Sequence, residues 1–315
     1  GDGTLILNSK SVTTGSILLD GGVLDIANSI TTGALGGTDG SLTIQDGKVL
    51  TLTGTDGSES VLSGVTVSGK TTWMLKGNAN LKMGEGSRLS GQELEVRENA
   101  VFNMGAETHS VSSFNGDGTL KGEGGRLTVA TDGSDVFSGQ LSGNGTVAKD
   151  GSGSLSLKTA GTSGIALSLN KGILALSGSP DGHVAYAGLS TASGTTLKLA
   201  PGADGSSNMS MDLGSGNLEL ANNTRVELSV IPLVRAGMAG PVVTTQGNVS
   251  VGSGSLFVLG CGEEYKNPES FSDLSMVLFK GSQASLGDHV TVEGKGLFLV
   301  YYTDLALVND GAGSI

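Results

Sequence analysis

Apolar and polar residues alternate along this chain in many short runs, each bounded by glycine or aspartate. The runs include residues 4–7, 23–26, 42–44, 49–52, 72–75, 126–129, 155–157, 173–176, 218–220 and 256–259. A period of two places successive side chains on opposite faces of a β-strand. No stretch of the sequence keeps apolar residues at the helical spacing of i, i+3, i+4 and i+7 over about a dozen residues, so the pattern predicts an all-β protein.

One short motif recurs in these runs: glycine, any residue, leucine, any residue and a further aliphatic residue. Its copies begin at Gly3, Gly22, Gly40, Gly125, Gly153, Gly172, Gly216 and Gly254. The first two intervals, from Gly3 to Gly22 and from Gly22 to Gly40, are nearly equal, and the last, from Gly216 to Gly254, is twice the first. A period of roughly 20 residues indicates supersecondary units that bury their apolar faces only by stacking on their neighbours.

Two repeat folds have this period. The leucine-rich repeat is disfavoured because its L-x-x-L-x-L frame and its asparagine are missing from the sequence. A right-handed parallel β-helix fits better, because stacking pairs every strand except those at the ends on both sides. Eleven of the 17 aspartates directly precede a glycine, which is the chemistry of tight corners. The predicted fold is therefore an all-β solenoid with a C-terminal capping segment.

Composition and charge exclude several classes of function. Glycine supplies 54 of the 315 residues, and the net charge of −12 would repel a phosphate backbone, so we expect no nucleic-acid partner. Apolar runs are far shorter than the roughly 20 residues of a membrane-spanning helix. The one cysteine, Cys261, cannot form an internal disulfide. Because the chain begins at Gly1, we expect it to be a processed or excised part of a longer protein.

The segment 137–157, FSGQLSGNGTVAKDGSGSLSL, resembles the passenger-associated transport repeat, also called the autotransporter-associated β-strand repeat. The positions on that pattern are Phe137, Ser138, Gly139, Leu141, Gly143, Gly145, Val147, Lys149, Gly151, Gly153, Leu155 and Leu157. Residues 169–176, LNKGILAL, match the second strand of the repeat, so the motif extends over 137–178. The intervening TAGTSG departs from the pattern, and a degenerate copy lies at 116–129.

The resemblance implies the secreted or surface-displayed passenger region of a Gram-negative autotransporter. It implies a location outside the cell or on the outer-membrane surface, and a translocator barrel outside this chain. Residues 274–308 resemble the closing coils of such a passenger. We therefore expect a β-helix solenoid over 1–230 and a C-terminal cap over 231–315.

Few side chains suggest a ligand site. Trp73 is the only tryptophan, and an exposed indole would stack on a sugar, whereas a core position is the alternative. Glu93 and Glu95 share one strand face with Arg97 alongside, which suits either a sugar site or a solvated face with ion pairs. Tyr301 belongs to a Tyr-Tyr pair, one of whose rings faces outward. These five residues are the candidate ligand contacts.

No motif predicts catalysis. The histidines His109, His183 and His289 stand far apart without metal-ligand spacing, so we expect solvent or corner histidines, no metal, no cofactor and no enzyme. The predicted function is a structural stalk and adhesin whose partners are host glycans, mucin or extracellular matrix. Two alternatives stay open: a polysaccharide-processing β-helix enzyme and a self-associating surface-layer protein.

Overall fold

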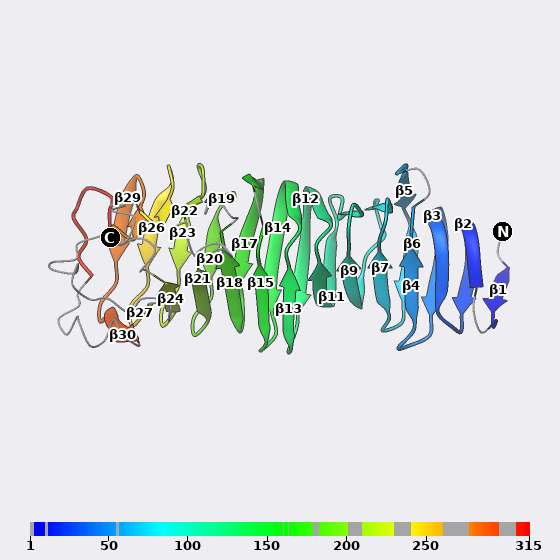
Figure 1. The fold of residues 1–315 in the computed structure, drawn as a ribbon, viewed down its shortest axis with the longest axis horizontal. Coiled ribbons are helices and arrows are strands. Elements are labelled where there is room, and N and C mark those ends of the chain that lie inside the picture. The colour runs from blue at the N-terminus through cyan, green and yellow to red at the C-terminus, as the bar shows by residue number, and fades with distance from the viewer. Residues whose placement is uncertain are drawn as a thin grey trace. The chain divides into compact units, whose positions relative to one another are not determined.

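The computed structural model describes residues 3–9, 12–54, 57–159, 161–162, 164–178, 183–200, 210–229, 241–260, 277–295 and 307–315. These residues form strands, turns and bends without a helix, and the strands stack in parallel as a β-solenoid, which confirms the predicted fold class (Figure 1). The chain divides into two compact units, unit 1 over 1–151 and unit 2 over 152–315.

Unit 1 contains the longest strands of the described chain, β2 and β3, which have 15 residues each. Its strands are β1 (Thr4–Leu7), β2 (Val12–Ile26), β3 (Ile30–Ile44), β4 (Val49–Leu52), β5 (Glu59–Leu62), β6 (Val65–Ser68), β7 (Thr72–Leu75), β8 (Asn80–Met83), β9 (Ser90–Val96), β10 (Val101–Asn103), β11 (Thr108–Gly116), β12 (Thr119–Ala130), β13 (Ser134–Phe137) and β14 (Gln140–Asp150).

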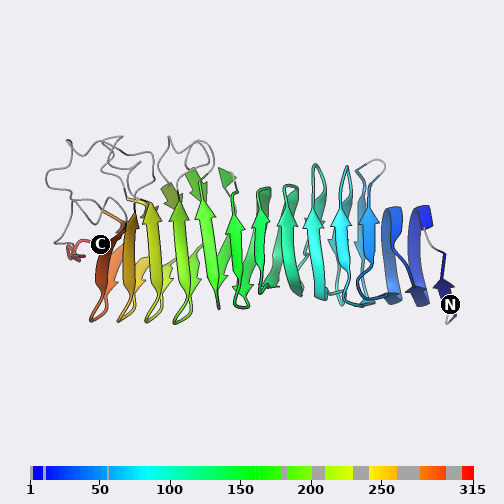
Figure 2. The same ribbon diagram turned by 60° about the horizontal axis from the view of Figure 1, so that its bottom comes forward.

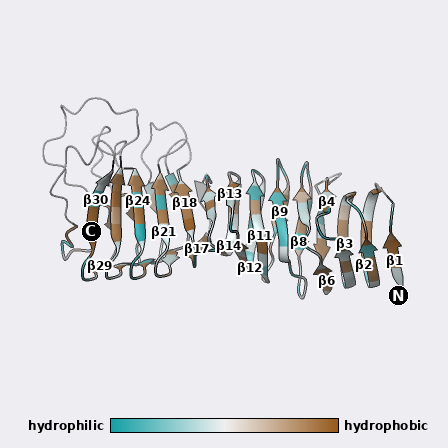
Figure 3. Cartoon of the chain, turned by 90° about the horizontal axis from the view of Figure 1, so that it is seen from below, coloured by the Kyte–Doolittle hydropathy of each residue, from teal (hydrophilic) through white to brown (hydrophobic). Residues whose placement is uncertain are grey.

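The strands of unit 1 stack into parallel ladders, in which each inward side chain lies against its counterpart one turn away. Figure 3 shows the result as strands that carry both hydrophobic and hydrophilic segments. Full burial of one aliphatic side chain stabilises the fold by about 1.5–3 kcal/mol. Stacked inward residues are Leu24, Leu42 and Val67 in one ladder, Ile30, Leu50, Trp73 and Leu94 in a second, and Leu81, Phe102, Leu120 and Leu141 in a third.

The first copies of the glycine-leucine motif stack directly on one another, as the repeat predicts. Leu5 pairs with Leu24, and Leu24 pairs with Leu42, so each motif copy lies one turn from the next. The turn lengthens later in the same unit, where Leu50 pairs with Trp73. A short repeat period is thus confirmed for the N-terminal turns.

Unit 2 has described strands of two to six residues, and none matches the long strands of unit 1 (Figure 2). Its strands are β15 (Ser154–Leu157), β16 (Gly161–Thr162), β17 (Gly164–Leu169), β18 (Ile173–Ser177), β19 (His183–Ala185), β20 (Leu189–Thr191), β21 (Thr196–Ala200), β22 (Ser210–Asp212), β23 (Leu218–Leu220), β24 (Arg225–Ser229), β25 (Val243–Thr244), β26 (Asn248–Val251), β27 (Leu256–Gly260), β28 (Phe279–Lys280), β29 (Gln283–Leu286) and β30 (Thr291–Lys295).

One ladder of unit 2 shows how its turns grow in length. The ladder passes through β15, β18, β21, β24 and β27, and each interval between paired inward residues is longer than the one before it. The added residues lie in the connections, since the paired strands keep their register. The stacked residues are Leu155, Leu174, Leu197, Val226 and Phe257.

The increasing turn length shows that the interval from Gly216 to Gly254 does not contain two short turns, although it is twice as long as the first interval. Leu218, in the motif copy at Gly216, pairs with Val249 after a single long turn. The strand that follows Gly254 stacks instead on β24, and there Phe257 faces inward while Leu256 is half-buried. Insertions in the connections, which strand patterning does not reveal, break the simple period.

The predicted boundary between 230 and 231 lies outside the described residues, as do Cys261, Tyr301 and residues 274–276 and 296–306 of the segment 274–308. The described strands on either side of that boundary continue the same ladders. β24 pairs with β27, and β27 pairs with β30.

Aspartates at the corners bind backbone amides, as the Asp-Gly pattern predicts. Asp39 Oδ1 accepts a hydrogen bond from the Gly40 N–H at 2.7 Å, and Asp46 Oδ1 accepts one from Lys70 N–H in the next turn at 2.7 Å. Gly40 has a φ of 115°, and a Cβ there would lie 2.7 Å from the Gly22 carbonyl oxygen. Glycine is therefore required at this corner by both conformation and space.

The transport-repeat segment begins in unit 1, where it places its lysine inside the solenoid. Residues of β12 stack on β14, with Leu127 against Val147. The buried Lys149 ammonium donates hydrogen bonds to the carbonyl oxygens of Thr131 at 3.3 Å, Gly151 at 2.8 Å and Asp150. Burial lowers the pKa of Lys149, and the three carbonyls supply polar partners for the desolvated charge.

His109 is a core residue, which corrects the expectation of a solvent or corner histidine. Its side chain is fully buried, and its ring meets Phe102 edge-on. The Leu89 N–H donates to Nδ1 at 3.2 Å, so the neutral tautomer carries its proton on Nε2 and donates to the Met104 carbonyl at 2.8 Å. Burial lowers the pKa of His109, because the charged imidazolium would be desolvated.

Replacing an inward leucine should cost far more stability than replacing its outward neighbour. Leu197→Ala removes a fully buried side chain from the ladder of unit 2, so we expect a loss of about 2–5 kcal/mol in the free energy of unfolding. Lys198→Ala, one residue away on the outer face, should cost at most about 1 kcal/mol. Urea denaturation followed by circular dichroism compares them, and equal losses would contradict the assigned faces.

Unit 1 should lose stability as the pH falls below the ordinary histidine pKa of about 6.5. His109 in the unfolded chain then gains a proton that the folded state resists, so protonation favours unfolding. Trp73 fluorescence in urea reports the transition. His109→Gln keeps a donor and an acceptor but cannot titrate, and its urea midpoint should change less than that of the wild type between pH 7 and pH 5. Parallel changes in both proteins would exclude His109 as the cause.

Candidate functional site

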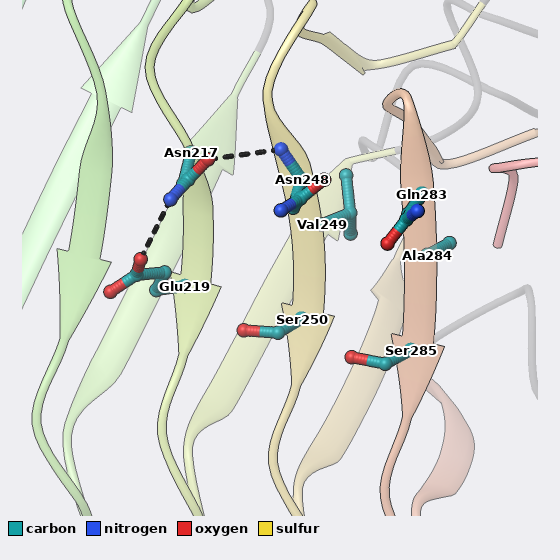
Figure 4. A pocket seen from close by; sticks show the side chains of 8 residues that line it. All are labelled: Asn217, Glu219, Asn248, Val249, Ser250, Gln283, Ala284 and Ser285. Atoms are coloured by element: carbon teal, nitrogen blue, oxygen red, sulfur yellow. Dashed lines mark hydrogen bonds between the residues drawn. The ribbon is translucent and has the colours of Figure 1, made fainter.

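Unit 2 carries a groove on the outer face of three neighbouring strands, β23, β26 and β29 (Figure 4). It encloses about 280 Å³ and is formed within one parallel ladder. We call it the polar groove, because amide, carboxylate and hydroxyl side chains supply most of its lining. The lining residues are Asn217, Glu219, Asn248, Val249, Ser250, Gln283, Ala284 and Ser285.

Strand register arranges the outward side chains in two rows. Val249 is buried and pairs with Leu218 on one side and Ala284 on the other, so the residues before and after it face outward. The row that precedes these inward positions contains amides, and the row that follows contains a carboxylate and two hydroxyls. The first row is Asn217, Asn248 and Gln283, and the second is Glu219, Ser250 and Ser285.

Hydrogen bonds orient one side of the polar groove. Asn217 Nδ2 donates to Glu219 Oε1 at 3.0 Å, while Asn217 Oδ1 accepts from the Asn248 N–H at 3.0 Å (Figure 4). Asn248 Oδ1 in turn accepts from the Ser282 hydroxyl at 3.0 Å. The Asn217 amide is thus held between two strands, and it restricts the Glu219 carboxylate.

The other side chains of the polar groove are available to a ligand. Within the described part of the chain, the side chains of Ser250, Gln283 and Ser285 make no hydrogen bond, and Gln283 and Ser285 are exposed. Hydroxyl and amide groups both donate and accept. The groove therefore presents hydrogen-bonding groups of both kinds beside one anionic carboxylate.

Trp73 occupies the core position, which is one of the two positions that the sequence left open, so its indole is not available as a ligand contact. Its side chain is fully buried in the ladder between Leu50 and Leu94. In β7 the buried residues are Trp73 and Leu75, so the indole ring fills the solenoid core. Its Nε1–H has no hydrogen-bond partner among the described residues.

Glu93 and Glu95 share the outer face of β9, as the alternation predicts, and Arg97 follows them. Arg97 Nε donates to Glu95 Oε1 at 2.6 Å, and Glu93 accepts from the Thr72 hydroxyl at 2.7 Å. These contacts are ion pairing and hydrogen bonding on an outer face. Tyr301 lies outside the described residues.

The polar groove was not predicted from the sequence. A signal does exist, because NLEL, NVSV and QASL each place an amide just before an inward aliphatic residue. Those three segments lie far apart in the sequence and at unequal intervals, so the matching positions become visible only once the strands are paired.

A second polar cluster lies on the outer face of unit 1, where Glu123 meets two lysines. Glu123 carboxylate oxygens lie 2.6 Å from Lys82 Nζ and 3.2 Å from Lys121 Nζ, and one accepts from Asn103 Nδ2 at 2.9 Å. These hydrogen bonds from Lys82, Asn103 and Lys121 lower the pKa of Glu123 to about 2. Glu123 thus joins three side chains that stack in register, of which Asn103 is fully buried.

Among the described residues, no group of three or more His, Cys, Asp or Glu side chains is arranged to hold a metal ion. A search of the same residues also finds no helix with the length and apolar content needed to span a membrane. Comparisons with protein-family models, with curated proteins and with solved structures find no match for this chain.

The low pKa of Glu123 can be tested directly. We expect the side-chain carboxyl of Glu123 to titrate near pH 2 in NMR spectra, against about 4.3 for an unperturbed glutamate. Lys82→Met removes the closest cation and should raise that pKa. Lys48→Met, which changes a lysine outside this cluster, is the control. An unchanged Glu123 titration in Lys82→Met would contradict the assigned pairing.

Proposed function

We propose that this chain is the β-helical passenger region of a secreted or surface-displayed Gram-negative protein, acting as a structural stalk and adhesin. The parallel solenoid supports the proposal, because stacked turns form a scaffold from short repeats. The transport-repeat motif supports it too, since Lys149 and Val147 of that motif have structural roles inside unit 1. A translocator barrel would lie outside this chain.

The polar groove is the observation that carries the adhesive part of the proposal. Its outward amides and hydroxyls lie on rigid, paired strands, and they suit the recognition of a hydroxyl-rich or amide-rich surface. Host glycans, mucin and extracellular matrix are the proposed partners. The net charge of −12 disfavours a nucleic-acid partner.

The proposal predicts that the displayed chain confers adhesion. Residues 1–315 are fused to a bacterial translocator barrel, and surface exposure is measured by protease accessibility on intact cells. Cells that display the chain should bind immobilised mucin saturably at low and at high salt, whereas cells with the barrel alone should not. Binding that disappears at high salt would indicate nonspecific charge attraction.

Two results would contradict this function. Retention of a folded chain inside the cell would argue against a passenger role. Correct display without binding to mucin, matrix proteins or glycan arrays would contradict the adhesive function but not the role as a structural stalk.

A further inference from the structure

We propose that the polar groove of unit 2 binds a neutral, linear saccharide chain that lies across β23, β26 and β29. This inference rests on the proposed adhesive function and specifies both its site and its ligand class.

Register gives the polar groove a repeating set of hydrogen-bonding groups. Neighbouring strands lie about 4.8 Å apart, so the amide row and the second row, of one carboxylate and two hydroxyls, each extend across three strands at that spacing. A linear saccharide also repeats its hydroxyl groups at a regular interval along one direction. Such a ligand can place successive sugar units over successive strands, which an isolated small molecule cannot do.

The chemistry of the lining suits sugar hydroxyls. The Glu219 carboxylate accepts hydrogen bonds and, as an ionised acceptor, makes stronger bonds to hydroxyl groups than a neutral acceptor does. Asn217 donates to one of its oxygens, so the other oxygen, Oε2, is left to receive a ligand hydroxyl. The Gln283 amide and the Ser250 hydroxyl add donors and acceptors on the neighbouring strands.

The charge of the polar groove selects against anionic glycans. Among the lining residues that the structure describes, Glu219 is the only ionisable side chain, and the chain as a whole carries a net charge of −12. Sulfate, sialate or uronate groups placed beside this carboxylate would be repelled. A neutral saccharide avoids that repulsion and still gains the charge-assisted hydrogen bonds.

The groove is partly organised before any ligand binds. Asn217 is fixed between Glu219 and the Asn248 backbone, and Asn248 is fixed by Ser282. Side chains that are already held lose less conformational freedom on binding. The short side chains of Ser250 and Ser285 keep the second row low, so a sugar ring can approach the strands.

The test measures binding of neutral and anionic oligosaccharides to the purified 315-residue chain. Isothermal titration calorimetry and saturation-transfer NMR use cellotetraose, maltotetraose and chitotetraose as neutral probes, with sialyllactose and a heparin hexasaccharide as anionic probes. We expect saturable binding of at least one neutral probe and no binding of the anionic ones. Glu219→Ala should weaken that binding about tenfold, as loss of a charge-assisted hydrogen bond does.

Two serine variants distinguish binding in the polar groove from binding elsewhere on the surface of unit 2. Ser250→Leu fills the groove and should abolish binding, whereas Ser156→Leu, on the outer face of β15 in the same unit, should leave it unchanged. Circular dichroism and thermal unfolding check that both variants fold. If Ser250→Leu misfolds, Ser285→Leu replaces it, because it obstructs the same row at the neighbouring strand.

The outcomes distinguish this inference from the proposed function. Absence of saturable binding to every neutral probe, preference for an anionic probe, or undiminished binding by the folded groove-filling variant would each overturn the groove as a saccharide site. Mucin adhesion by displayed wild type that persists in Ser250→Leu would overturn the groove alone. Failure of displayed wild type to adhere at all would overturn the adhesive function itself.

Discussion

Parallel stacking in register is the constraint on which the rest of each unit depends. Every turn must place an apolar residue against the apolar residue of the turn before it, while backbone groups pair between the turns. Leu174, for example, lies between Leu155 and Leu197, and all three are buried. Because the side-chain period is two, a slip of one residue would move a whole strand's apolar set to the outer face. Register therefore controls both the core and the surface.

Buried polar groups are accommodated only where backbone groups or neighbouring side chains can satisfy them. Asp135 lies in the core beside Phe114, and its carboxylate accepts from the Phe114 N–H at 2.9 Å and from the Ser113 hydroxyl at 3.0 Å. His109 and Lys149 find carbonyl partners in the same way. Such groups cost stability when they lose a partner, so each restricts its strand to one register.

Strand register also aligns the outward side chains of neighbouring turns in rows. In unit 1 this order brings Lys82, Asn103 and Lys121 into one row, with Glu123 beside them, and the charges compensate one another. In unit 2 it produces the polar groove, where amides and hydroxyls repeat without such compensation. Two outward rows with the same origin thus differ, because the side chains of one are paired with each other, whereas Ser250, Gln283 and Ser285 of the groove make no hydrogen bond within the described part of the chain.

The sequence by itself determined the strands, the corners and the fold class. Alternation identifies strands such as β4, β7 and β27, and glycine after aspartate marks corners such as Asp39–Gly40, because both signals are local. It also placed Glu93 and Glu95 on one face. Only the tertiary structure decided which of two alternating faces turns inward, as Trp73 and His109 show. Pairing across the long turns of unit 2, and hence the groove at Asn217, Asn248 and Gln283, was likewise decided there. Alternation defines two faces but not their orientation, and insertions of variable length hide which strands become neighbours.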